Sequence, residues 1–116
     1  MEQSAEIAPL FFLIKDSKGK LFLLLSDIAY LQADRNYTII FLTDGKTQFI
    51  VCGCLKTHLE RLERTKNFCR IHHSYAVRIN YVLRIDDNGT ITMRNGIQLD
   101  STTEHRHDLE RRMPFC

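Results

Sequence analysis

The chain has 116 residues, of which 44% are hydrophobic and 26% are charged. This length suits one globular domain with one core and leaves no room for a second. No apolar run approaches the roughly 20 residues that a membrane-spanning helix needs, and the acidic opening at 1–6 lacks the basic start of a secretory signal. We therefore expect a cytoplasmic protein.

The net charge is only +2, which by itself is weak support for a nucleic-acid partner. The distribution of charge is more informative. Residues 56–78 carry six basic and two acidic side chains, a balance of +4. Three histidines in the same window could add positive charge near a polyanion. The alternative interpretation is an ordinary solvated face.

The sequence pattern in the first half of the chain predicts β-hairpins. The turn-forming residues 16–19 separate two apolar runs. Further along, the Asp44-Gly45 pair predicts a type I′ turn, because both central residues of that turn need positive φ. Five strands are expected here, at 10–15, 20–26, 27–34, 37–42 and 47–52.

The end of the chain predicts a meander followed by a helix. Short strands at 81–85, 90–94 and 97–99 are separated by two Asn-Gly turns. At 101–112, the Ser101-x-x-Glu104 pattern predicts a capping box, and two terminal arginines suit the negative end of the helix dipole. The apolar face of this helix is thin, chiefly Leu109 and Met113.

One further helix is expected at 55–64. Leu55, Leu59 and Leu62 recur at i, i+4 and i+7, which is one face of an amphipathic helix.

The stretch 67–77 fits neither a clean helix nor a half-buried strand. Phe68, Ile71 and Val77 are typical core anchors. Five hydrogen-bonding side chains stand among them, more than a small core could easily satisfy, so we expect some of them to face a partner. These five are Arg70, His72, His73, Ser74 and Tyr75.

The order Arg-x-His-x-Ser-Tyr-x-Val in this stretch resembles the signature of the LytTR DNA-binding domain, found at the C-terminus of many bacterial response regulators. Two more blocks share the resemblance, which covers about residues 10–112. At 26–38 an apolar-aromatic strand precedes a polar loop ending in Asn-Tyr, and at 97–101 a short strand leads into a serine. The order and spacing of the three blocks match the family.

The resemblance implies a mostly β fold, an elongated stack of small antiparallel sheets with one or two short helices. It places the DNA-binding domain at 10–113, between tails at 1–9 and 114–116. Such a domain belongs to a transcriptional regulator that reads double-stranded DNA through loops. Side chains on any rigid protrusion can enter the major groove, where bidentate groups read purine edges.

The family's three contact loops fall on 34–37, 72–74 and 101–103, and we expect these loops to converge on one rim. The predicted base contacts are Arg35, Asn36, His73, Thr102 and Thr103. The predicted phosphate contacts are Lys56, Arg70, Ser74, Arg78 and Arg106.

Several of these residues have structural alternatives. Asn36 could stabilise its turn, His72 could be a satisfied interior histidine, and Arg70 could anchor neighbouring carbonyl groups. Two positions depart from the family pattern: Thr102 follows the serine where many members have a basic residue, and Arg78 stands where asparagine is common. Both departures leave the target sequence open.

Other kinds of site have weaker support. Cys52, Cys54 and Cys69 with the paired histidines could suggest zinc, but C-x-C with one distant cysteine is a poor match to a structural zinc site. We expect reduced thiols, with Cys52 packed on its strand, and no metal or cofactor. No enzyme is expected either, since sequence adjacency of Cys69 or Ser74 to histidine does not provide catalytic geometry.

The expected partner is double-stranded DNA that carries paired direct repeats, with self-association of the protein on the DNA. The chain would be a stand-alone regulator or the effector end of a longer one, and a stand-alone form would need a control input such as a membrane or sensor partner. The rival function is a small β module whose positive face binds a protein or an anionic lipid. Salt-sensitive affinity for random duplex DNA would separate the two.

Overall fold

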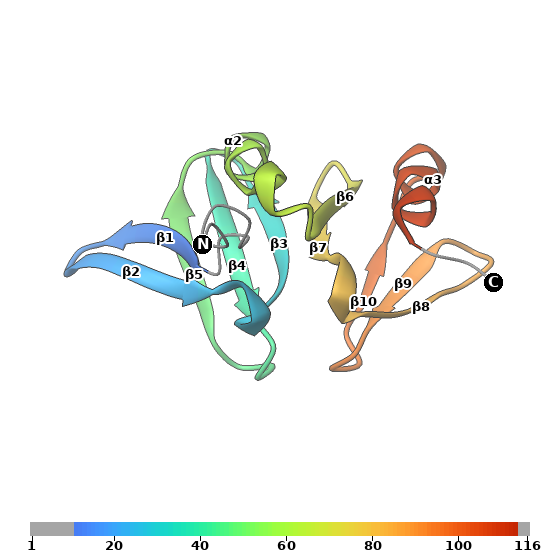
Figure 1. The fold of residues 1–116 in the computed structure, drawn as a ribbon, viewed down its shortest axis with the longest axis horizontal. Helices are drawn as coiled ribbons and strands as arrows, with labels where there is room; N and C mark the ends of the chain where they lie inside the picture. The colour runs from blue at the N-terminus through green and yellow to red at the C-terminus, as the bar shows by residue number, and fades with distance from the viewer. Residues whose placement is uncertain (1–10, 114–116) are drawn as a thin grey trace, which may run out of the picture.

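The computed structural model describes residues 11–113, so the predicted tails at 1–9 and 114–116 lie outside the described residues. The described part contains three antiparallel sheets, as the mostly β prediction expected (Figure 1). No helix in this part is long and apolar enough to cross a membrane. The body measures 42 × 40 × 24 Å.

The first sheet is a hairpin of β1 (Phe11–Asp16) and β2 (Gly19–Leu24). The central sheet has five strands in the order β5-β4-β3-β7-β6. Its strands are β3 (Ile28–Asp34), β4 (Tyr37–Leu42), β5 (Gln48–Cys52), β6 (Phe68–His72) and β7 (Tyr75–Arg78).

The third sheet is the predicted meander, with the order β10-β9-β8. Its strands are β8 (Val82–Ile85), β9 (Thr90–Met93) and β10 (Gln98–Asp100). The α-helices are α2 (Leu55–Leu62) and α3 (Thr103–Arg112), and short 3₁₀ turns lie at η1 (Leu25–Asp27), η2 (Glu63–Thr65) and η3 (Ile79–Tyr81).

Strand β3 lies between two hydrophobic clusters, which explains its nearly continuous apolar sequence. Ile28 and Leu31 belong to one cluster, which α2 and the β1–β2 hairpin cover. Ala29 and Tyr30 belong to the other, formed with the meander and α3. The central sheet is therefore held from two sides, and its turns are fixed relative to both helices.

The stretch that fitted no simple pattern forms the β6–β7 hairpin. Its three predicted anchors are buried: Phe68 is 6% exposed, and Ile71 and Val77 are 0% exposed. The leucine pattern of α2 is also confirmed, since Leu55 and Leu62 are buried. The hairpin joins the two halves of the molecule, with α2 on one side and α3 on the other (Figure 1).

Three local predictions were wrong. Asp44 does not adopt positive φ, so the β4–β5 connection is no type I′ turn. Instead the Asp44 carboxylate accepts hydrogen bonds from the backbone N–H groups of Lys46 and Thr47 at 2.8 Å each, which lowers the pKa of Asp44 to about 2. Cys52 was expected to pack on its strand, but its side chain is on the outward face of β5 and is exposed.

The cap of α3 is the third difference. Thr102, not Ser101, is the N-cap residue, and its hydroxyl accepts the N–H of His105. Ser101 instead donates its hydroxyl proton to the carbonyl oxygen of Gly89 at 2.6 Å. Both residues can cap a helix, so the tertiary contact to Gly89 decides between them.

Candidate nucleic-acid interface

The three predicted contact loops lie next to one another, joined by backbone hydrogen bonds. Ala33 N–H donates to the Ser74 carbonyl at 2.8 Å, which joins the β3–β4 and β6–β7 turns. Thr102 N–H donates to the Ile71 carbonyl at 2.9 Å, which joins the β6–β7 hairpin to the start of α3. We call residues 34–37, 72–74 and 101–103 together the contact edge.

The start of α2 is tied to the same edge. Gly53 N–H donates to the carbonyl oxygen of Asn36 at 2.9 Å, so the β5–α2 junction supports the β3–β4 turn. In Figure 1, α2, the β6–β7 turn and α3 follow one another along the upper border of the view. Segments 30 to 70 residues apart in the chain are thus brought to one side of the molecule.

The β3–β4 turn presents a two-residue tip. Asp34 and Tyr37 form the last pair of the ladder, which leaves Arg35 and Asn36 between them. Arg35 has a φ of 59°, an uncommon conformation for a residue with a side chain. All four residues are exposed. The tip therefore projects a guanidinium and an amide into solvent from a rigid hairpin.

The β6–β7 turn is closed by Arg70, as the structural alternative for this residue predicted. Its Nε donates to the His72 carbonyl at 3.1 Å, and its Nη2 donates to the carbonyl of His73. The Ser74 N–H donates to Nδ1 of His72 at 3.0 Å. These bonds leave the exposed His73 ring outermost, stacked on His72 with 4.3 Å between ring centroids.

The surroundings of His72 disfavour its charged form. Partial burial is the largest cause that lowers the pKa of His72, followed by the neighbouring His73, while Asp100 acts in the opposite direction. The neutral form agrees with an Nδ1 that accepts a hydrogen bond. His72 is therefore a structural member of this edge, and His73 is the histidine that faces outward.

In the third loop and the adjoining first turn of α3, some side chains make intramolecular hydrogen bonds and others are exposed to solvent. The Thr102 hydroxyl caps α3 and lies 2.7 Å from Nδ1 of His105. Arg106 donates from Nη1 to Ser101 Oγ at 3.1 Å. Thr103 is exposed. Of the three predicted contacts in this region, Thr103 has the side chain most available to a partner.

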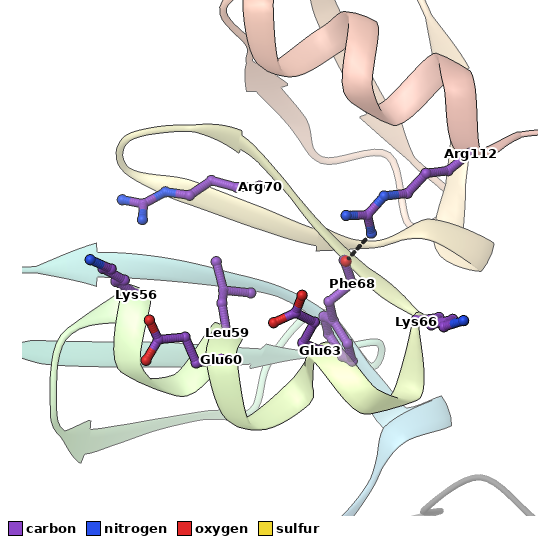
Figure 2. Close-up of a pocket in the computed structure, with 8 residues that line it drawn as sticks. All are labelled: Lys56, Leu59, Glu60, Glu63, Lys66, Phe68, Arg70 and Arg112. Atoms are coloured by element: carbon purple, nitrogen blue, oxygen red, sulfur yellow. Dashed lines mark hydrogen bonds between the residues drawn. The ribbon is translucent and has the colours of Figure 1, made fainter.

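A cleft of about 590 Å³ opens beside the contact edge, between α2 and β6 (Figure 2). The predicted phosphate contacts Lys56 and Arg70 lie at one end of this cleft, and Arg112 and Lys66 lie at the other. Arg112 donates to the Phe68 carbonyl at 2.8 Å. The remaining lining residues are Leu59, Glu60, Glu63 and Phe68.

A family model described as the LytTr DNA-binding domain matches residues 18–113 of this chain. The chain belongs to the LytTr DNA-binding domain family. No curated protein sequence matches it. Among solved structures, it is similar to the LytTr DNA-binding domain of a methyl-accepting/DNA response regulator from Bacillus cereus, with 20% identity and a TM-score of 0.72 over 93% of this chain and 100% of that one.

Residues 18–113 thus form a DNA-binding domain of the LytTr family. Its mostly β fold with two short α-helices agrees with that membership.

Arg78, a predicted phosphate contact, has a structural explanation in this LytTr domain. Its Nε donates to the Ile28 carbonyl at 2.6 Å, and its Nη2 donates to the Ser26 carbonyl at 3.0 Å. The guanidinium also lies 5.3 Å from the ring centroid of Tyr81. Burial lowers the pKa of Arg78. The Arg78 side chain therefore links the start of β3 to η3, and its guanidinium is held against the protein surface.

The described cysteines form no metal site. Within residues 11–113, no three His, Cys, Asp or Glu side chains are grouped so as to hold a metal ion. Burial raises the pKa of the Cys69 thiol to about 11, and this thiol lies 3.6 Å from an Asp108 carboxylate oxygen. Cys52 and Cys54 are exposed.

Sequence reasoning missed two residues that support the edge. Gly53 has a φ of 103°, and a Cβ there would lie 2.8 Å from His58 Nε2. His58 is buried and donates from that nitrogen to the Cys52 carbonyl at 2.7 Å. The signal was present in the sequence: a glycine stands between Cys52 at the end of a strand and Cys54 before the helix, and five residues after the glycine a histidine falls on the leucine face of α2.

Proposed function

We propose that this LytTr domain binds double-stranded DNA with its contact edge, placing Arg35, Asn36, His73 and Thr103 against base edges in the major groove. The observation that carries the proposal is the pair of backbone hydrogen bonds, Ala33 to Ser74 and Thr102 to Ile71, which align three loops on one side. Loops held in this way act as a rigid protrusion, which base readout requires.

Phosphates would be bound by the basic side chains that flank the edge. Lys56 is exposed on the first turn of α2, next to the junction that supports Asn36. Arg70 and Ser74 are partly exposed beside His73, and Arg106 is partly exposed on α3. Arg70 donates to two carbonyls of the edge itself, His72 and His73, so its guanidinium stays at the edge. We leave Arg78 out of this set because the two carbonyls that it donates to, Ile28 and Ser26, hold its guanidinium at the start of β3, outside the three loops. Thr102 would contribute through its position at the N-terminus of α3, since its hydroxyl serves as the cap.

The functional unit in this proposal is the domain at 10–113, working as part of a bacterial transcriptional regulator in the cytoplasm, where its DNA is. Two copies would occupy paired direct repeats. The role proposed is binding alone, with no catalytic step and no cofactor. A control input through a membrane or sensor partner is compatible with this arrangement and is not required by it.

Nuclear magnetic resonance mapping tests the proposal directly. A duplex recovered by selection from a random pool is titrated into isotope-labelled protein, and the amide signals of each loop are followed. We expect the largest shifts at 34–37, 72–74 and 101–103, with small shifts in the β1–β2 hairpin. Shifts confined to two loops, or centred on the hairpin, would rule out the contact edge as the binding surface.

A random duplex of equal length is the control. It should bind more weakly, with an affinity that falls steeply as salt is added, because phosphate contacts release counterions. The absence of any salt-sensitive affinity for either duplex would contradict DNA binding by this edge and favour the protein- or lipid-binding alternative.

A further inference from the structure

The β1–β2 hairpin is apolar on both of its faces. Its inner face packs into the core through Phe12, Ile14 and Leu23, which are 3%, 4% and 7% exposed. A sheet with one solvated face normally alternates apolar and polar residues, and strands that are apolar on both faces are usually covered on both faces. In this hairpin only the inner face is covered by the described residues.

The outer face consists of three cross-strand pairs. Phe11 lies opposite Leu24, Leu13 opposite Phe22, and Lys15 opposite Lys20. The four apolar side chains are 49%, 41%, 36% and 62% exposed, in that order. The rings of Phe11 and Phe22 lie edge to face with 6.2 Å between centroids. We call these four apolar side chains with the two lysines the outer hairpin face.

The lysine pair adds a second observation. Like charges directly opposite each other destabilise an antiparallel pair, and Lys18 in the adjoining turn adds a third positive charge. An exposed apolar patch that continues into a basic cluster is unfavourable for an isolated domain. A partner surface that is apolar at one end and acidic at the other would cover the apolar patch and neutralise the charge of the lysines.

A second copy of this chain offers such a surface. Side chains two residues apart on a strand are separated by about 7 Å. Two outer hairpin faces can pack about a two-fold axis so that the Leu13–Phe22 pair of each copy covers the Phe11–Leu24 pair of the other. The lysine pair of each copy then lies about 7 Å beyond the Phe11–Leu24 pair of the other copy. The chain there continues from Leu24 into η1, where Asp27 is exposed.

We propose that the outer hairpin face is a self-association surface, in which two copies pack face to face about a two-fold axis and Lys15 and Lys20 of each lie near Asp27 of the other. The hairpin projects from the side of the molecule, apart from the border formed by α2, the β6–β7 turn and α3 (Figure 1). The surface therefore remains accessible whether or not the contact edge of one copy is occupied. Because the two copies of a two-fold dimer cannot both occupy direct repeats in the same orientation, we propose this dimer for the protein free of DNA.

Sedimentation equilibrium of the chain over a concentration series tests the proposal. We expect reversible dimers, weakened about tenfold or more by Phe22→Ser, the loss typical of truncating a central aromatic anchor. Leu83→Ser is the matched control, because Leu83 is 56% exposed on β8 and lies outside the hairpin. The control should dimerise like the unmodified chain. A chain that stays monomeric at every concentration would overturn the proposal.

A charge swap distinguishes this packing from other contacts. Lys20→Asp and Asp27→Lys should each weaken the dimer, and the double variant should recover it, with thermal melts confirming that each variant folds. Absence of recovery would overturn the two-fold arrangement.

A vesicle-binding experiment tests the alternative partner. Capture of the chain by phosphatidylglycerol vesicles but not by phosphatidylcholine vesicles, lost in Phe22→Ser, would instead assign the face to anionic lipid. Single-site DNA affinity should be unchanged in Phe22→Ser, which separates this result from the DNA-binding proposal.

Discussion

The backbone N–H of Thr102 donates to the carbonyl oxygen of Ile71 at 2.9 Å, which joins the start of α3 to the strand that ends in the His72-His73 turn. Because this bond is made by main-chain atoms, it survives a change of side chain at either residue. The contact edge can therefore keep its shape while its outward side chains vary. Single substitutions at exposed positions of the edge should report on recognition and leave the fold intact.

His73→Ala is the first such substitution. The ring is exposed and the turn beneath it is held by Arg70, so stability should change by less than about 0.5 kcal/mol. Binding to the selected duplex should weaken by about 1–3 kcal/mol, the cost of losing one base contact, while binding to random duplex changes little. Fluorescence anisotropy on both duplexes measures the difference. Equal losses on the two would refute base reading by His73.

Lys56→Ala is the complementary substitution. Its exposed ammonium is predicted to contact phosphate, so affinity should fall by a similar factor for selected and random duplexes. The slope of log affinity against log salt should also become shallower by about one. Glu60→Ala, on the same helix and lining the same cleft, is the control and should not weaken binding. A loss confined to the selected duplex would give Lys56 a role in base readout.

The fold was largely accessible from the sequence because its strands and helices follow local patterns. Alternation and Asn-Gly turns predicted the meander, and the leucine spacing predicted α2. Local patterns could not predict which of two neighbouring side chains makes a given hydrogen bond when both are chemically able to make it. Ser101 and Thr102 can both cap α3, and only the position of the Gly89 carbonyl, brought near by the meander, decides that Thr102 does so.

The contact edge was predicted from the family resemblance and not from periodicity. The bonds that align its loops join Ala33 to Ser74 and Ile71 to Thr102, across long stretches of chain, and no local pattern encodes them. Arg78 illustrates the same limit. A basic residue beside a DNA-binding signature suggests phosphate, but its two carbonyl partners precede it by about 50 residues. Only the folded structure brings Ile28 and Ser26 to its guanidinium.

Arg78→Met tests that structural role. The substitution keeps much of the aliphatic stem but leaves the Ser26 and Ile28 carbonyls without their donor, so the free energy of unfolding should fall by about 1.5–3 kcal/mol. Chemical denaturation measures this loss. At a temperature where the variant is still folded, its affinity for random duplex should match that of the unmodified domain. A stable variant with a shallower salt slope would restore Arg78 as a phosphate contact.

Thr102→Ala and Thr103→Ala distinguish the helix-capping role of Thr102 from the base contact proposed for the exposed Thr103. Removing the Thr102 hydroxyl leaves the N–H of His105 without its acceptor and should cost about 1 kcal/mol of stability. Thr102→Ser keeps the oxygen and should recover most of it. Thr103 is exposed, so Thr103→Ala should leave stability unchanged and weaken only the selected duplex. Denaturation and anisotropy on the same three proteins distinguish the two roles.

His58 makes the stability of this domain depend on pH. It is 5% exposed, donates from Nε2 to the Cys52 carbonyl, and accepts at Nδ1 from Arg61 Nη1 at 3.3 Å. A second proton would have to enter at Nδ1, which faces a guanidinium. Burial, and to a lesser degree Arg61, lower the pKa of His58 below its ordinary value of 6.5, although the bond to Cys52 acts in the opposite direction.

The sign of the pH dependence follows from this lowered pKa. As pH falls through about 6.5, the unfolded chain binds the proton first, so the contribution of His58 to the free energy of unfolding is constant above that pH and decreases below it. His58→Gln keeps an N–H donor for the Cys52 carbonyl but cannot titrate. Its denaturation midpoint should therefore vary less between about pH 7.5 and 5.5 than that of the unmodified domain. The pKa of His72 is also lowered, so a smaller slope should remain. Identical pH profiles for the two proteins would show that His58 is equally easy to protonate folded and unfolded.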